Sequence, residues 1–224
     1  MSPGSSADGQ PQGIQRDPEP DAVARIGPNA ILRLIEALDE RFGRAKTEAV
    51  FRASGQHEYL ATLPGAMVDE RSITALYTSL PEQLGPAEAA EVSAHAGLLT
   101  GEYLLAHRIP AAAQRVMKMM PAALAARTLL AAIDVHSWTF AGSGTFERQH
   151  IEGAGGGGRS RVYWRLSVAN CPLCRGASLA EPACAYYAAT FERIFRQLVA
   201  TSARVIETRC RATGAAACVF EVSW

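Results

Sequence analysis

Four side chains near the C-terminus have the types and spacing of a zinc site. Glu207-Thr-Arg-Cys210 ends one expected strand and Cys218 begins the next, so a hairpin would bring these three together. Cys184 lies in the first turn of an expected helix that could pack over the same sheet. Three thiolates and one carboxylate would close a tetrahedral shell with no open position, which is typical of a structural zinc ion. The pattern therefore predicts metal ligands at Cys184, Glu207, Cys210 and Cys218.

Spacing alone leaves other interpretations of the cysteines open. Free cysteines often act as small buried apolar residues, and Cys218 lies on the apolar face of its expected strand. A further motif, Cys171-Pro-Leu-Cys174, follows another expected strand and is a half-site common to zinc and redox proteins. This motif either joins the metal site or only lies near it.

The N-terminal segment differs in composition from the rest of the chain. Residues 1–22 are rich in Gly, Pro, Ser and Asp and are expected to form a disordered tail. The segment lacks the apolar stretch of a signal peptide, so we expect a cytoplasmic location in which the cysteines stay reduced. Residues 23–224 are expected to form a single domain, with the zinc- and ligand-binding part at about 136–224.

Charge and hydropathy exclude two classes of partner. Lys and Arg together number 22, as do Asp and Glu, so the formal net charge is zero. A neutral chain lacks the basic surface that nucleic acid requires. No apolar run approaches the roughly 18 residues of a membrane span. We therefore expect no nucleic-acid partner and no membrane span.

Helices are expected to dominate the first half of the chain. Apolar residues at helical spacing predict helices over about 29–42, 47–60, 69–80, 87–107, 110–133 and 181–201. Pro81 is expected to end the third of these helices and Pro121 to kink the fifth.

The second half has the alternation of strands. Trp138 to Phe140 and Phe146 to Ile151 flank Gly142-Ser143-Gly144, which predicts a hairpin. Clean alternation over 161–168 predicts a strand, and two more are expected at about 204–209 and 217–224. The result is an α+β fold: a helical N-terminal half and an antiparallel sheet of four to five strands with one packed helix.

A glycine run offers a formal match to a dinucleotide-binding motif. Residues Gly153 to Gly158 satisfy G-x-G-x-x-G. That motif binds pyrophosphate only between a strand and a helix N-terminus, whereas a strand follows here. We interpret the run as a flexible loop, and no Walker-type motif is present either. The sequence thus provides no motif for a nicotinamide or nucleotide cofactor.

Three segments of the chain resemble the 4-vinyl-reductase domain family. They read Glu181-Pro-Ala-Cys184, then Glu207-Thr-Arg-Cys210-Arg-Ala-Thr-Gly214, then Cys218-Val-Phe220. The family includes ligand-sensing domains of aromatic-responsive transcription activators, and its fold is similar to subunits of vesicle-tethering complexes. In the aromatic-sensing members the matching Cys, Glu, Cys and Cys bind zinc. The resemblance therefore implies a zinc ion on the four ligands named above.

The long Ala-rich helices and the Asn170-Cys171-Pro-Leu-Cys174 stretch are most similar to family members from bacteriochlorophyll biosynthesis. This resemblance implies a protein that binds a magnesium tetrapyrrole, either divinyl protochlorophyllide or a precursor. It would present the pigment to pathway enzymes or assist reduction of its 8-vinyl group, called 4-vinyl in older numbering. A true 4-vinyl reductase and a homodimeric adaptor or small-molecule sensing module are the alternatives.

Several side chains are weaker candidates for contact with such a pigment. A neutral imidazole can ligate magnesium in a chlorin, methionines adapt to irregular pockets, and aromatic rings stack on flat ligands. For each of them, ordinary packing or surface exposure is the competing interpretation. The candidates are His95, His107, His136, Met117, Met119, Met120, Tyr103, Trp138, Phe140 and Trp164.

Overall fold

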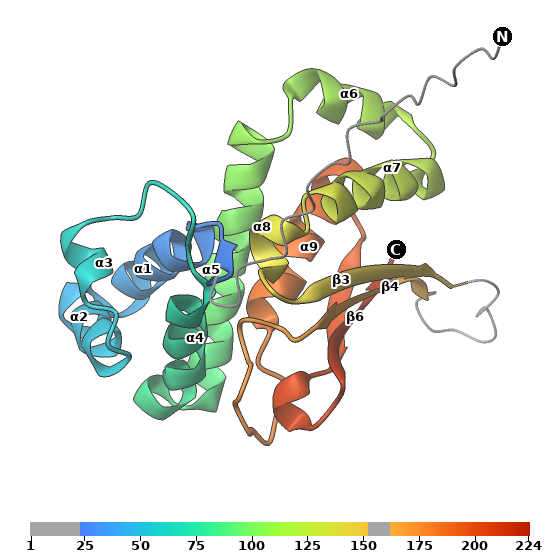
Figure 1. Ribbon diagram of the computed structural model, residues 1–224. Helices are drawn as coiled ribbons and strands as arrows, with labels where there is room; N and C mark the ends of the chain where they lie inside the picture. Colours follow the sequence, from blue (N-terminus) through green and yellow to red (C-terminus); the bar gives the residue numbers. More distant parts are fainter. Residues whose placement is uncertain (1–22, 152–161) are drawn as a thin grey trace, which may run out of the picture.

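The computed structural model describes residues 23–151 and 162–224 (Figure 1). The expected N-terminal tail at 1–22 and the glycine run at 153–158 lie outside the described residues. The expectation of a single domain over 23–224 stays a prediction.

Helices make up most of the first part of the described chain, and each long helix buries apolar residues that its sequence pattern indicated. In α1, for example, Ile31, Leu34 and Leu38 are fully buried. The helices are α1 (Asn29–Phe42), α2 (Arg44–Ala53), α3 (Glu58–Ala61), α4 (Glu70–Leu84), α5 (Pro86–His107), α6 (Ala111–Met119), α7 (Ala122–Val135), α8 (Trp138–Ala141) and α9 (Ala185–Leu198).

The main sheet has four antiparallel strands in the order β3-β4-β6-β5. The strands are β3 (Thr145–His150), β4 (Val162–Ala169), β5 (Arg204–Arg209) and β6 (Ala217–Ser223). Trp164, Leu166 and Val168 of β4 are buried, as their alternation predicted. A separate two-stranded ladder joins β1 (Arg25–Ile26) to β2 (Val68–Asp69). The expected α+β fold is confirmed.

Helix α9 covers one face of the sheet, and α5 packs against α9 (Figure 1). Aromatic rings fill the layer between α9 and the sheet, where the ring centroids of Phe191 and Phe220 are 5.9 Å apart. Two glycines allow the helices to approach closely. A Cβ atom on Gly97 would lie 2.1 Å from the backbone oxygen of Tyr186, and one on Gly101 would lie 2.7 Å from Cβ of Arg193.

Two expectations about prolines were wrong or incomplete. Pro81 does not end its helix, because α4 continues to Leu84 and ends at Gly85, whose φ is 85°. Leu84 packs against the core, so burial of this last turn outweighs the backbone hydrogen bond that proline cannot donate. At Pro121 the chain breaks rather than kinks. Met120 is extended, as a residue before proline prefers, and α6 and α7 are separate helices.

The expected strand at 138–140 was also wrong, since these residues form the short helix α8. Three alternating residues do not distinguish a strand from one helical turn. Tertiary packing decides, because the ring of Phe140 lies edge-on to Phe146 and Tyr187. The hairpin of this region is formed instead by β3 and β4.

The expected helix at 47–60 is likewise interrupted. Helix α2 ends at Ala53, Gly55 takes a positive φ of 73°, and the separate turn α3 follows. The expected start of the last helix at Glu181 is also too early, because α9 begins at Ala185 with Cys184 as its N-cap.

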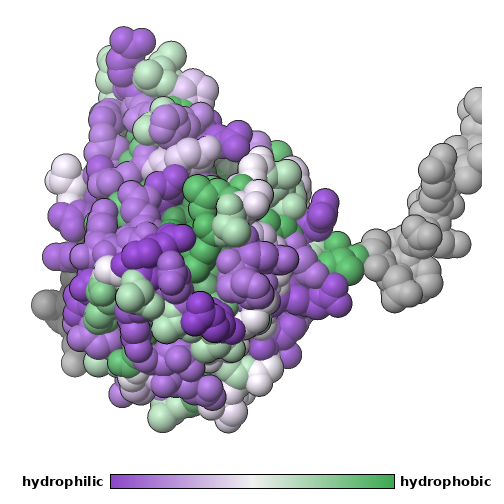
Figure 2. All heavy atoms as spheres, turned by 90° about the vertical axis from the view of Figure 1, so that its left-hand side faces the viewer, coloured by the Kyte–Doolittle hydropathy of each residue, from purple (hydrophilic) through white to green (hydrophobic). Residues whose placement is uncertain are grey.

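Figure 2 shows the face on the left of Figure 1, which is mostly hydrophilic with a band of hydrophobic atoms near its centre. Among the described residues, no helix combines the length and apolar character needed to cross a membrane. The expected cytoplasmic location stays a prediction.

Candidate functional site

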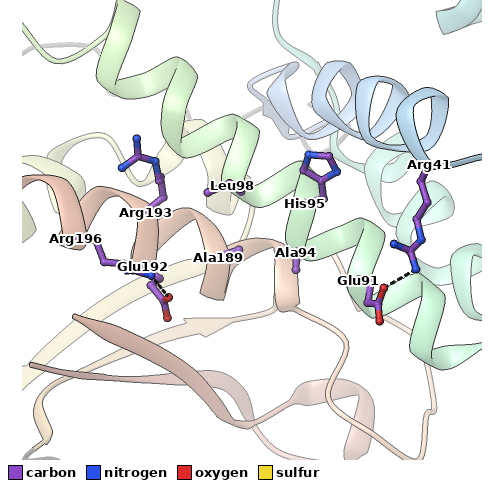
Figure 3. A pocket seen from close by; sticks show the side chains of 9 residues that line it. All are labelled: Arg41, Glu91, Ala94, His95, Leu98, Ala189, Glu192, Arg193 and Arg196. Atoms are coloured by element: carbon purple, nitrogen blue, oxygen red, sulfur yellow. Dashed lines mark ion pairs between the residues drawn. The ribbon is translucent and has the colours of Figure 1, made fainter. Parts of the chain in front are cut away.

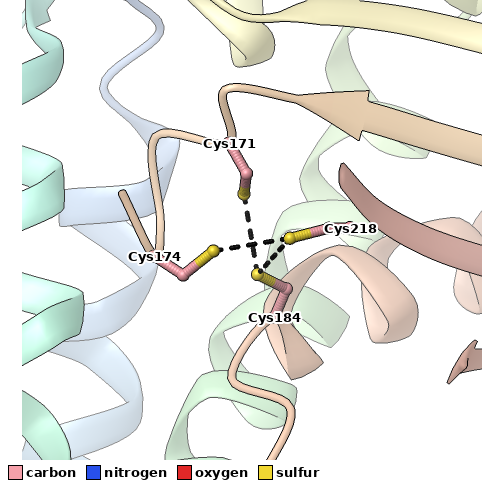
Figure 4. Close-up of side chains that lie close together, drawn as sticks. All are labelled: Cys171, Cys174, Cys184 and Cys218. Atoms are coloured by element: carbon pink, nitrogen blue, oxygen red, sulfur yellow. Dashed lines mark hydrogen bonds between the residues drawn. The ribbon is translucent and has the colours of Figure 1, made fainter. Parts of the chain in front are cut away.

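Five thiols and one carboxylate converge where the sheet meets the start of α9, and Figure 4 shows four of the thiols pointing toward one another. All five cysteines are buried and none forms a disulfide. They come from three places in the fold. Cys171 and Cys174 lie in the loop after β4, Cys184 caps α9, and the hairpin of β5 and β6 supplies Glu207, Cys210 and Cys218.

Strand register explains why residues far apart in sequence meet here. β4 pairs with β6 so that Val168 lies opposite Cys218, which places the loop after β4 next to the start of β6. β5 pairs with β6 on its other side, with Glu207 opposite Phe220. The cluster thus forms at the end of the sheet where β4 finishes and β6 begins.

The six side chains form two overlapping sets of possible metal ligands. Within each set, the ligand atoms all lie within 4.8 Å of one another. One set is the predicted one, and the other replaces the carboxylate and one thiol by the C-x-x-C pair. The sets are Cys184, Glu207, Cys210 and Cys218, and Cys171, Cys174, Cys184 and Cys218. The structure therefore brings the four predicted residues together, and it brings the C-x-x-C motif to the same place.

Distances between sulfur atoms agree with tetrahedral metal coordination. A Zn–S bond of about 2.3 Å gives a tetrahedron with S···S edges of about 3.8 Å. The Sγ atom of Cys184 lies 3.6 Å from that of Cys171 and 3.5 Å from that of Cys218. The Sγ atom of Cys218 is 3.4 Å from that of Cys174 and 3.9 Å from that of Cys210.

Glu207 provides an independent observation that the site fits a cation. Its Oε2 atom accepts a hydrogen bond of 2.8 Å from the backbone N–H of Cys184. Its Oε1 atom is buried without a hydrogen-bond partner. Leaving a buried carboxylate oxygen unsatisfied is costly, and coordination of a metal ion would remove that cost.

Backbone amides also favour negative charge on the sulfurs. The N–H of Ala183 donates to Sγ of Cys210, and the N–H of Arg211 donates to Sγ of Cys218, both at 3.4 Å. Such contacts orient metal-binding thiolates and stabilise their charge.

The acid–base properties of the cluster follow from burial and crowding. Burial raises the pKa of Glu207 to about 8, and negative charge on Cys210 adds to the rise. For Cys210, hydrogen bonding to Cys174 raises the pKa. Hydrogen bonds from Cys184 and Cys218 outweigh this and lower its pKa to about 6. The groups cannot all ionise cheaply together, and a bound divalent cation would stabilise their fully ionised state.

The loop that carries Cys171 and Cys174 is anchored to the helical half, a feature that the sequence did not reveal. Arg175 donates to Oε1 of Glu70 at 2.5 Å, and the hydroxyl of Thr74 donates to the carbonyl of Pro172 at 2.6 Å. Glu70 is only 5% exposed and also accepts from both N–H and Oγ of Ser143. Helix α4 therefore fixes the position of the C-x-x-C loop.

A surface groove lies between α5 and α9 and is closed at one end by α1 (Figure 3). Its volume is about 790 Å³. We expected a ligand pocket between the helices and the sheet, but this groove lies between helices. Its lining combines charged side chains with small and apolar ones: Arg41, Glu91, Ala94, His95, Leu98, Ala189, Glu192, Arg193 and Arg196.

Of the three candidate histidines, His95 is the one that lines this groove. Its Nε2 atom lies 3.3 Å from Oε2 of Glu40. His107 lies against the ring of Tyr103, at a centroid distance of 4.8 Å. His136 contacts the carbonyl of Ala132 through Nδ1 at 2.8 Å.

The methionines and the other aromatic candidates do not line the groove. Met117 is in the core and Met119 is 87% exposed. Trp164 is buried and Phe140 packs against the core, whereas Trp138 is exposed.

Comparison with known proteins places this site in a family context. The model of the 4-vinyl-reductase domain matches residues 164–223, a segment that contains all six side chains of the cluster. A curated relative from Cereibacter sphaeroides, the bacteriochlorophyll synthase 23 kDa chain, is 41% identical over 206 residues, covering 91% of this chain and 92% of the relative. This chain belongs to that family.

A second member of the family agrees with the first. The bacteriochlorophyll synthase 23 kDa chain of Rhodobacter capsulatus is 36% identical over 201 residues, covering 89% of this chain and 87% of the relative. Both alignments extend far beyond the 4-vinyl-reductase segment, so the family relationship includes the helical half that contributes to the groove. The resemblance inferred from the cysteine pattern is confirmed.

Proposed function

We propose that this protein serves bacteriochlorophyll biosynthesis by binding a magnesium tetrapyrrole intermediate and presenting it to pathway enzymes. The observation that carries the proposal is the family relationship, because two relatives named as chains of bacteriochlorophyll synthase align with about nine-tenths of this chain. The pigment would be divinyl protochlorophyllide or a precursor, and presentation could include assistance with 8-vinyl reduction.

The groove between α5 and α9 is our candidate for the pigment site. Its volume of about 790 Å³ falls in the range of roughly 300–1,000 Å³ that is usual for small-molecule sites. Ala94, Leu98 and Ala189 present short or apolar side chains at the helix seam, against which a flat macrocycle can lie.

The charged lining of the groove supports the same assignment. Its three arginines and two glutamates give a formal charge of +1 with His95 neutral (3 − 2 = +1). Pathway intermediates carry a free propionate, which an arginine can bind through paired hydrogen bonds. We assign Arg193 to this contact and His95 to the magnesium ion, since neutral imidazole is a suitable ligand.

For the cysteine cluster we propose a structural zinc ion held by Cys184, Glu207, Cys210 and Cys218. The unpartnered Oε1 atom of Glu207 supports its role as a ligand. A closed set of four protein ligands leaves no position for substrate, so the metal would stabilise the fold and not take part in chemistry.

Family members are named as one chain of a synthase, which supports a role together with other pathway enzymes. We therefore favour a binding subunit over an enzyme that acts alone. A true 4-vinyl reductase is the alternative, and it requires a hydride donor held against the pigment.

The test is a spectral titration of the purified full chain with magnesium protoporphyrin monomethyl ester and with divinyl protochlorophyllide, each with and without NADPH. We expect a saturable shift of the pigment absorption bands and no formation of monovinyl product. NADPH-dependent reduction by the protein alone would establish the reductase instead. Absence of any spectral change with both pigments would overturn the binding proposal.

A matched pair of variants locates the site. His95→Ala should weaken pigment binding because it removes the expected magnesium ligand. His136→Ala, at the C-terminal end of α7 and outside the groove lining, should leave binding unchanged. Equal affinities for both variants would remove His95 from the site without contradicting pigment binding itself.

A further inference from the structure

We infer that the cluster is a binuclear centre that holds two zinc ions, with the sulfurs of Cys184 and Cys218 bridging them. The first ion is the one proposed above, on Cys184, Glu207, Cys210 and Cys218. The second would use Cys171 and Cys174 as its own terminal ligands together with the two bridging sulfurs. This adds a metal site to the one that the family resemblance implies.

The geometry is that of two tetrahedra sharing one edge. Each four-ligand set is compact, and the atoms common to both are the sulfurs of Cys184 and Cys218, which lie 3.5 Å apart. The remaining members divide cleanly, with Cys171 and Cys174 completing one set and Glu207 and Cys210 the other. The shared edge is close to the length of about 3.8 Å expected for a zinc–thiolate tetrahedron.

The terminal pair of the second set is already in position. Sγ of Cys171 lies 3.6 Å from Sγ of Cys184, and Sγ of Cys174 lies 3.4 Å from Sγ of Cys218. Both residues are almost fully buried, at 0% and 1% exposure. The anchoring of their loop by Glu70 and Thr74 holds these sulfurs against the bridging pair without help from a metal.

A single ion leaves part of the cluster without a partner, whichever set it occupies. If it sits on the four cysteines, Oε1 of Glu207 stays buried and unsatisfied. If it sits on the set with Glu207, two buried thiols remain within 3.4 and 3.6 Å of its thiolate ligands. Two ions use all six side chains.

Charge is also consistent with two ions. Five thiolates and one carboxylate carry −6, and two divalent ions reduce this to −2 (−6 + 4 = −2), the same total as one ion on four anionic ligands (−4 + 2 = −2). The backbone N–H groups of Ala183 and Arg211, which point at sulfurs of the cluster, stabilise the remaining negative charge.

The experiment measures zinc per chain in the purified full-length protein and follows cobalt binding to the metal-free protein under reducing, oxygen-free conditions. We expect two zinc ions per chain. Cobalt should give a high-spin EPR signal that grows up to one equivalent and falls as the second binds, because bridging thiolates couple the two spins. This readout needs no variant and does not depend on pigment binding.

Two double variants then assign the ions. Cys171→Ser with Cys174→Ser should retain one ion, and so should Glu207→Gln with Cys210→Ser, each with an uncoupled cobalt signal. One zinc per wild-type chain, with an EPR signal that persists beyond one equivalent of cobalt, would overturn the binuclear centre. The variant that then loses its metal would show which set holds the single ion. Iron with acid-labile sulfide in place of zinc would overturn it as well.

Because this inference concerns the metal alone, its failure is distinguishable from failure of the proposed function. A single zinc together with a normal pigment titration would remove only the second site. Two zinc ions without pigment binding would leave the centre intact and remove the proposed function.

Discussion

The cysteine cluster and the groove between α5 and α9 differ in how their polar atoms are satisfied. In the cluster, buried sulfurs face one another and Oε1 of Glu207 has no partner. In the groove each arginine already has a carboxylate, as in the 2.5 Å contact between Arg41 and Glu91 and the 3.4 Å contact between Arg193 and Glu102. The cluster therefore requires a cation to complete it, whereas the groove is complete without a ligand.

This difference predicts different consequences of mutation. Metal binding to a buried site is coupled to folding, so damage to the cluster should reduce stability. Exposed ion pairs contribute little to stability, so changes in the groove should alter ligand affinity alone. The contrast can be tested from the largest expected effect to the smallest.

Cys218→Ser should have the largest effect, because Cys218 belongs to both ligand sets. We expect loss of bound metal and a decrease in the free energy of unfolding of more than about 4 kcal/mol, the range seen when a structural metal is lost. Cys210→Ser, which affects one set, should lower metal content and stability less. Metal analysis and denaturant unfolding measure both. Unchanged metal content in Cys210→Ser would remove that residue from the shell.

Gly97→Ala tests the seam between α5 and α9, along which the groove runs. The new Cβ would lie 2.1 Å from the backbone oxygen of Tyr186, so the helices must move apart. We expect a loss of about 3 kcal/mol in the free energy of unfolding. Gly65→Ala is the control, since a Cβ there meets no atom within 4 Å. Equal stability of the two variants would show that the helices separate at no cost.

Glu70→Gln tests the anchor of the C-x-x-C loop. Burial alone would raise the pKa of Glu70, but hydrogen bonds from Arg175 and Ser143 outweigh it and lower the pKa below its usual value. The stabilisation is therefore present above the unfolded-state pKa and is lost as pH falls toward the lower folded-state pKa. We expect the variant to lose about 2 kcal/mol at neutral pH, within the range for hydrogen bonds to charged groups.

Unfolding measured as a function of pH checks this prediction. The difference between wild type and Glu70→Gln should shrink as the pH is lowered through the usual range of carboxyl groups. A difference that stays constant with pH would mean that the charge of Glu70 is not what stabilises the loop.

Arg193→Gln should have the smallest effect on stability, within about 0.5 kcal/mol, because its ion pair with Glu102 is partly exposed to solvent. If the groove binds a pigment carboxylate, affinity for magnesium protoporphyrin monomethyl ester should fall about tenfold, equivalent to about 1.4 kcal/mol. Spectral titration measures the affinity. A stability loss comparable to that of the cluster variants would contradict the contrast between the two regions.

The sequence by itself determined the α+β class, the long helix α5 and the strands β4, β5 and β6. These elements carry strong periodic patterns that local physics enforces, such as the alternation of Trp164, Leu166 and Val168. Spacing also indicated the four ligands now found together, since a hairpin joins Glu207 and Cys210 to Cys218 over a short stretch of chain.

Only the tertiary structure decided the rest. Helix α4 continues through Pro81 and residues 138–141 form a helix, because packing outweighed weak local signals. The two ligand sets and the groove unite side chains from distant segments, such as Arg41 of α1 with Arg193 of α9. Local patterns specify elements and their buried faces, but distances between elements are set by how those faces pack together.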